Sequence, residues 1–114
     1  MERPLPIACI FRSTRTDHAE AEYREWSDRI ERLVTVAPGY RSHMSLRDPV
    51  TREGVTIAYF DDLDSVAAWR DQVEHLQAQR LGRERFYEEY VVQIAQVTRE
   101  YGWQHPLRAG DETT

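Results

Sequence analysis

The residues best suited to chemistry in this chain are one imidazole and several aromatic rings within residues 69–90. If that segment is one continuous helix, a single face carries four residues at steps of four, three and four: His75, Gln79, Gly82 and Phe86. A histidine there could accept a proton near neutral pH, or hydrogen-bond a phenol or a carbonyl. We therefore take His75 as the candidate catalytic residue. The alternative is a solvent-facing imidazole that bonds a neighbouring carboxylate such as Glu74.

Trp69 lies on the apolar side of the same predicted helix. Core packing is the simplest interpretation of its indole, and the alternative is a pocket wall that stacks on a planar ligand. In that hypothesis Trp69 acts beside His75 in catalysis, and the ligand contacts five further side chains: Phe11, Met44, Phe60, Gln79 and Phe86. His43 is a second histidine of interest, which we interpret mainly as a surface or interface residue, with catalysis as the less favoured alternative.

Motifs for metals and common cofactors do not stand out. The histidines are scattered, and no HExxH, CxxC or EF-hand pattern occurs. The glycines are isolated, so no phosphate-binding loop is predicted, and no serine nucleophile elbow is present. We expect a site without a metal ion and without a nucleotide or flavin held by a known loop.

Composition limits the possible partners. The chain has 114 residues, which suits one domain, and a net charge of −5 with acidic and basic groups interleaved. Nucleic acid is a disfavoured partner, because binding it requires a clustered basic face. The single cysteine, Cys9, lies in an apolar run and is predicted to be a small buried hydrophobe. No signal peptide and no apolar run of membrane-spanning length is apparent, so we expect a soluble cytoplasmic protein that does not bind membranes.

The first half of the chain predicts a strand, a helix and a strand. Residues 7–12 are apolar and partly β-branched, which indicates a strand, and Thr16 or Asp17 is a plausible helix N-cap. Apolar residues then recur at helical steps up to Pro38 and Gly39: Ala19, Tyr23, Trp26, Ile30, Leu33 and Ala37. Residues 40–47 alternate as a half-exposed strand, with Tyr40, Ser42, Met44 and Leu46 on one face and Arg41, His43, Ser45 and Arg47 on the other.

The second half predicts a strand, a helix and a strand. Residues 48–54 form a hairpin connection to a strand over residues 55–60. Asp61 and Asp62 cap a helix whose apolar stripe is Leu63, Val66, Trp69, Val73 and Leu76. We expect helix to continue to about Glu89, with a possible break at Gly82, and a last strand over residues 91–99. Residues 1–103 form the predicted domain, and residues 104–114 a flexible tail.

The order β-α-β-β-α-β predicts a ferredoxin-like α+β fold, with a four-stranded antiparallel sheet and both helices on one face. The first, third and fourth strands are apolar on both sides, whereas a sheet with one wet face shows cleaner alternation. We therefore expect the second face to be buried against a twofold copy, which makes the protein a homodimer.

Four segments resemble the antibiotic biosynthesis monooxygenase (ABM) superfamily: A-P-G-Y at 37–40, V-T-I-A-Y-F-D-D-L at 55–63, A-W-R-D-Q-V-E-H-L-Q-A-Q-R-L-G at 68–82 and V-T-R-E-Y-G-W at 97–103. The resemblance covers roughly residues 6–103. It implies a dimeric α+β barrel with a pocket in each protomer between sheet and helices. It also implies oxygenation of an aromatic or quinone-like, polyketide-type compound without metal or flavin, in a dry pocket that orients the substrate.

Two alternatives stay open. A branch of the same superfamily binds and degrades heme, and its members resemble this chain in the tryptophan of the second helix. They carry an iron-binding histidine ten positions later, where this chain has Gln79, and an asparagine on the first strand, where it has Ile10 or Phe11. His75 is four residues too early for that role. The second alternative is a non-catalytic dimeric ligand-binding module.

Overall fold

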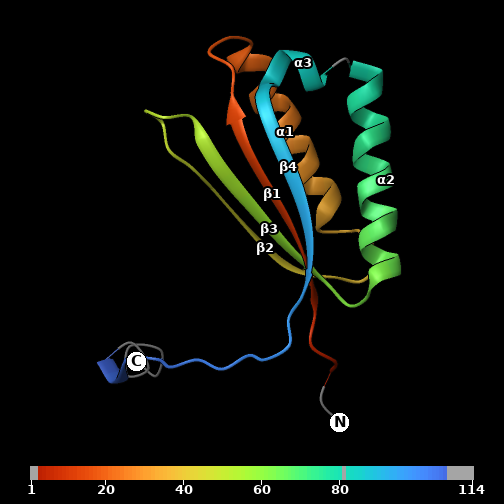
Figure 1. The fold of residues 1–114 in the computed structure, drawn as a ribbon, viewed down its shortest axis with the longest axis vertical. Helices are drawn as coiled ribbons and strands as arrows, with labels where there is room; N and C mark the ends of the chain where they lie inside the picture. The colour runs from red at the N-terminus through yellow and green to blue at the C-terminus, as the bar shows by residue number, and fades with distance from the viewer. Residues whose placement is uncertain (1–2, 81, 108–114) are drawn as a thin grey trace.

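The computed structural model describes residues 3–80 and 82–107, and the side chains among them except those of residues 77–80, 82 and 83. Along the chain the elements are β1 (Ile7–Arg15), α1 (Glu20–Val34), β2 (Tyr40–Arg47), β3 (Glu53–Phe60), α2 (Leu63–Arg80), α3 (Gly82–Phe86) and β4 (Tyr87–Gln96) (Figure 1). None of the described helices is both long enough and apolar enough to cross a membrane.

The four strands form one antiparallel sheet in the order β2-β3-β1-β4. Helices α1 and α2 lie on the same side of this sheet (Figure 1). The predicted ferredoxin-like α+β fold is therefore confirmed, including the antiparallel sheet and the position of the helices.

The core lies between the sheet and the helices. Alternate residues of the central strands point toward the helices, and one of the bulkiest of them, Phe60, is completely buried. Val66 and Trp69 from α2 and Val34 from α1 pack against the same cluster as Ile7. Helix α1 is amphipathic, and α2 turns Val66 and Trp69 toward the apolar face of the sheet, whereas Leu63 of its predicted stripe is 63% exposed.

The end of α2 differs from the prediction. Helix was expected to continue to about Glu89, but α2 ends at Arg80, the short α3 spans Gly82–Phe86, and β4 begins at Tyr87. The reason is that β1 runs on to Arg15, three residues further than predicted, and Arg15 pairs with Tyr87. Pairing with β1 thus places in a strand a segment whose local sequence pattern predicts a helix.

The predicted N-cap of the first helix is also wrong. Helix α1 begins at Glu20 behind Ala19, which adopts a left-handed conformation (φ 58°) and gives no side-chain cap. Thr16 is used elsewhere, because its hydroxyl donates a hydrogen bond to the carbonyl of Arg85 (2.7 Å). Its backbone N–H donates to the carbonyl of Phe86 (3.0 Å), so Thr16 fixes α3 against the end of β1.

A buried arginine strengthens the same corner. Arg15 is only 2% exposed; its Nε donates to the carbonyl of Phe86 (3.0 Å) and its guanidinium lies 3.6 Å from the ring centre of Tyr23. It also pairs with Glu20 (2.7 Å), whose pKa is held below its usual value by hydrogen bonds from Arg15 and Arg52. This network joins β1, α1 and α3, and so fixes where β4 starts.

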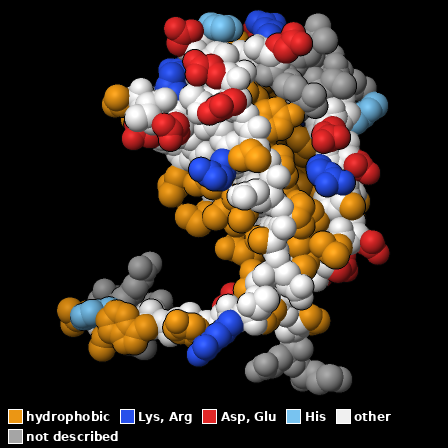
Figure 2. Space-filling model, viewed as in Figure 1, with side chains coloured by type: hydrophobic (Ala, Val, Ile, Leu, Met, Phe, Trp, Pro, Cys, Tyr) orange, Lys and Arg blue, Asp and Glu red, His pale blue; other side chains and the backbone are white. Residues whose placement is uncertain are grey.

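The sheet face opposite the helices, called the open face below, remains apolar. It carries Ile10 of β1, Met44 and Leu46 of β2, Val55, Ile57 and Tyr59 of β3, and Val91 of β4, as the strand registers require. Met44, Leu46 and Val91 are 50%, 64% and 48% exposed. After β4 the chain leaves the sheet as an extended arm, and residues 98–107 are all exposed (Figure 1). Figure 2 shows apolar side chains gathered over the middle of the molecule and again on this arm.

Candidate functional site

A cavity of about 170 Å³ lies between the helices and the helix-facing side of the sheet. Its position follows from side-chain size, because strands β1, β2 and β3 present small groups there: Cys9, Ser45, Thr56 and Ala58. Larger rings surround that space: Phe11, Tyr23, Trp26, Trp69, Tyr87 and Tyr90. An engineered cavity of about 150 Å³ in another protein holds benzene, so the present volume suits a single-ring ligand.

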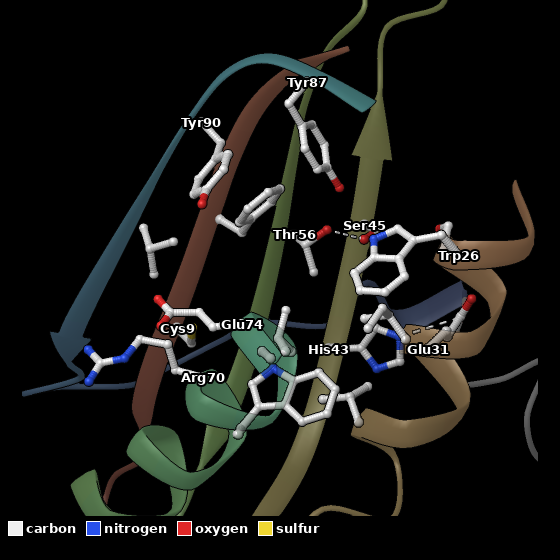
Figure 3. A pocket seen from close by; sticks show the side chains of 18 of the residues that line it. Cys9, Trp26, Glu31, His43, Ser45, Thr56, Arg70, Glu74, Tyr87 and Tyr90 are labelled. Carbon is white, nitrogen blue, oxygen red and sulfur yellow. Dashed lines mark hydrogen bonds and ion pairs between the residues drawn. The ribbon is translucent and has the colours of Figure 1, made fainter. Parts of the chain in front are cut away.

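Among the described residues, His43 is the histidine that lines this cavity. Its Nδ1 lies 2.6 Å from the hydroxyl of Tyr40, and its Nε2 lies 3.4 Å from Oε1 of Glu31. The His43 side chain is 15% exposed, whereas Glu31 is 64% exposed, so the carboxylate is the looser partner. Figure 3 shows His43 and Glu31 side by side at one end of the cavity.

This arrangement suits a group that accepts and returns a proton. The Tyr40 hydroxyl can donate to Nδ1 or accept from it, so either neutral tautomer of His43 is compatible with the contact. When a ligand replaces the weak contact with Glu31, Nε2 can act as the base. Once His43 is protonated, the Tyr40 hydroxyl accepts a hydrogen bond from Nδ1, and the nearby negative charge of Glu31 stabilises the imidazolium.

A second polar group lines the cavity on β2 and β3, where Ser45 is exposed and Thr56 is half-buried. Ser45 and Thr56 are directly paired across the strands, and their hydroxyls hydrogen-bond each other. The Tyr87 side chain points toward them, beside Trp26 (Figure 3). Burial is the main cause that raises the pKa of Tyr87 above its usual value, and the nearby phenol of Tyr23 adds to it. Tyr87 therefore stays protonated and can donate a hydrogen bond.

Cys9 lies on the floor of the cavity. Its side chain is buried, which confirms the prediction of a small buried hydrophobe. Burial raises the pKa of the thiol, and the positive charge of Arg70 opposes this shift only in part. Cys9 is therefore a neutral thiol at physiological pH, and a poor nucleophile. Within the described part of the chain, no three histidine, cysteine, aspartate or glutamate side chains group as metal ligands do.

Two of the residues predicted to form the site line the cavity: Trp69 and Phe11. Phe60 and Phe86 belong to the buried core, with 0% and 2% exposure, and are not among the lining residues. Met44 is on the open face, on the other side of the sheet.

His75 is exposed and is not among the lining residues, and the side chain of Gln79 lies outside the described residues. Helix geometry explains the position of His75. It follows Trp69 by six residues, so its side chain points about 120° away from that of Trp69 around the helix axis. The predicted role of His75 stays a prediction, without support from the cavity.

The residues that the sequence analysis underrated are His43, Glu31, Thr56 and Tyr87. Strand alternation placed His43 with Ser45, which is correct, but it placed Tyr40 on the opposite face. A register shift between Tyr40 and Ser42 turns Tyr40 to the helix side as well, where it packs against the core cluster. Such a bulge leaves no clear mark in the local sequence.

Several solved structures share the fold of this chain. SnoaB from Streptomyces nogalater, described as a cofactor-independent oxygenase, matches with a TM-score of 0.64 and 20% identity over 83% of this chain and 95% of that one. A Bordetella bronchiseptica protein assigned to the antibiotic biosynthesis monooxygenases matches with a TM-score of 0.63 and 16% identity, over 83% and 99%. MhuD, solved with two manganese protoporphyrin IX molecules per active site, matches with 0.64 and 13%, over 86% and 100%. The fold is that of the ABM superfamily.

Sequence comparison identifies a related protein. No protein-family model matches the chain. The uncharacterized protein YqjZ of Bacillus subtilis (strain 168) is 34% identical over 97 residues, which span 85% of this chain and 83% of YqjZ. The chain belongs to the same family as YqjZ.

Proposed function

We propose that this protein is a cofactor-independent monooxygenase-like enzyme that acts on a small aromatic or quinone-like compound with a single ring. The observation that carries the proposal is the cavity of about 170 Å³, which is lined by aromatic rings and, at one end, by the His43–Glu31 pair. The fold shared with SnoaB supports the reaction type. The volume favours a compound with one ring over a larger polyketide-type compound.

The reaction requires a proton acceptor and a dry environment. His43 would remove a proton from a phenol, and Glu31 would stabilise the imidazolium that forms. The ionised ring is electron-rich enough to pass an electron to dioxygen. In the net reaction, a ring carbon bearing two hydrogens in the keto tautomer becomes a carbonyl; one oxygen atom of dioxygen enters the product and the other leaves as water. The aromatic walls, including Trp69, would hold the ring and exclude solvent.

Oxygen uptake with a panel of single-ring phenols tests this proposal. His43→Gln should lower turnover by about 10²-fold, the usual contribution of a general base. His75→Gln is the matched control, because His75 is exposed and is not among the lining residues. If His75→Gln lowers turnover and His43→Gln does not, the proton acceptor is His75. If the phenols bind but no oxygen is consumed, the protein is a non-catalytic binding module and not an enzyme.

Heme is the cofactor that the superfamily suggests as an alternative, and the cavity does not fit it. Nδ1 of His43 lies 2.6 Å from the Tyr40 hydroxyl, and Glu31 lies 3.4 Å from Nε2, so an iron atom would have to displace Glu31 to reach the imidazole. The volume of about 170 Å³ is also small for a porphyrin. Hemin titration followed by the Soret band checks this expectation.

We also propose that the protein is a homodimer, formed through the open face. Leu46 is 64% exposed there and Met44 50%, and covering such a surface removes apolar area from water. Tyr101 and Trp103 on the C-terminal arm, 84% and 80% exposed, would be covered by the same partner. A second copy of the chain can cover both the open face and the arm, because in a twofold dimer each protomer offers the same surfaces to the other.

A further inference from the structure

Two of the polar side chains that line the cavity lie on the same strand. His43 and Ser45 are two residues apart on β2 and both face the helices. Residues so placed lie about 7 Å apart along a strand. That spacing is close to the length of a six-membered ring with a substituent at each end. A ring that touches His43 with one substituent therefore brings the opposite one to Ser45.

The group around Ser45 has hydrogen-bonding capacity to spare. Ser45 and Thr56 hold two hydroxyl hydrogens between them, and their mutual hydrogen bond uses one. The other hydrogen can be donated to a ligand. The Tyr87 hydroxyl interacts with the side chains of Trp26 and Tyr23 and points toward this pair (Figure 3). Ser45 is exposed and Thr56 is half-buried, so a purely apolar ring placed over them would bury the unused hydroxyl hydrogen without a partner, which is unfavourable.

We propose that Ser45, Thr56 and Tyr87 form a binding site for an oxygen atom of the ligand, across the ring from the edge that faces His43. The inference rests on the proposed function and makes it more specific. The ligand class is a single ring with oxygen substituents at opposite ends. The hydroxyls of Ser45, Thr56 and Tyr87 hold one oxygen, and the other faces His43. Ser45, Thr56 and Tyr87 are positioning residues, because they fix which end of the ring meets the base.

Thr56→Val tests the site, because valine keeps the shape of threonine and loses its hydroxyl. Thr14→Val is the matched control, since Thr14 is on a neighbouring strand and does not line the cavity. Binding of hydroquinone and of phenol is measured without oxygen by quenching of tryptophan fluorescence. The unchanged protein should bind hydroquinone about tenfold more tightly than phenol, as one added hydrogen bond allows. Thr56→Val should remove that difference, and Thr14→Val should keep it.

Tyr87→Phe provides a second variant, in case Thr56→Val does not fold, and it should also weaken hydroquinone binding relative to phenol. Equal binding of the two rings by the unchanged protein, or a preference for hydroquinone that survives both substitutions, overturns the oxygen site and leaves the proposed function standing. If neither ring binds, the proposed function fails together with the inference.

Discussion

The hydroxyl of Tyr40 lies 2.6 Å from Nδ1 of His43, although the two residues are three apart on one strand. In a regular strand they would point to opposite faces. The register shift between Tyr40 and Ser42 brings both to the helix side of the sheet. One irregularity in β2 thus converts a half-exposed strand histidine into a cavity residue whose ring orientation is fixed by a phenol.

Replacing Tyr40 by phenylalanine should therefore impair His43 without removing it. Tyr40→Phe keeps the ring that packs on Phe60 but removes the partner of Nδ1. We expect turnover to fall by about tenfold, since a hydrogen bond to a group that becomes charged is lost. Nitrogen NMR of the imidazole should show a changed tautomer population. Tyr59→Phe, on the open face, is the control, and an unchanged imidazole spectrum in Tyr40→Phe would contradict the assigned role.

The open face should control the oligomeric state. Met44→Glu combined with Leu46→Glu introduces two charges on this face and should convert a dimer into a folded monomer, because burying unpaired carboxylates is costly. Light scattering after size-exclusion chromatography gives the mass. Val36→Glu with Val50→Glu is the matched control, as those side chains are 76% and 86% exposed outside the sheet. A monomeric unchanged protein at micromolar concentration would remove the dimer proposal.

The fold was more predictable from sequence than the site, and the reason is physical. Apolar periodicity fixes elements that repeat a regular pattern, and it places β2 at its observed bounds, residues 40–47. The site depends on departures from regularity. The bulge beside Arg41 redirects Tyr40, and the pairing of Arg15 with Tyr87 turns a predicted helical segment into strand. Tyr87 enters the cavity only because of that pairing, which depends on contacts distant in sequence.

Trp69 has two roles that one substitution can separate. It is 7% exposed, it belongs to the core cluster and it lines the cavity. Trp69→Ala should lower the free energy of unfolding by about 3–5 kcal/mol, as other large-to-small core changes do. Leu63→Ala is the control on the same helix, because Leu63 is 63% exposed; its free energy of unfolding should change by no more than about 0.5 kcal/mol.

The same substitution should also change which ligands fit. Removing the indole adds space next to the present cavity, so a two-ring naphthol should bind to Trp69→Ala more tightly than to the unchanged protein, while phenol should bind less tightly because its ring loses a stacking surface. Denaturant titration measures the first effect and fluorescence or calorimetric titration the second. A variant that loses stability but keeps the original order of ligand preference would show that Trp69 serves the core alone, and that other rings set the size of the ligand.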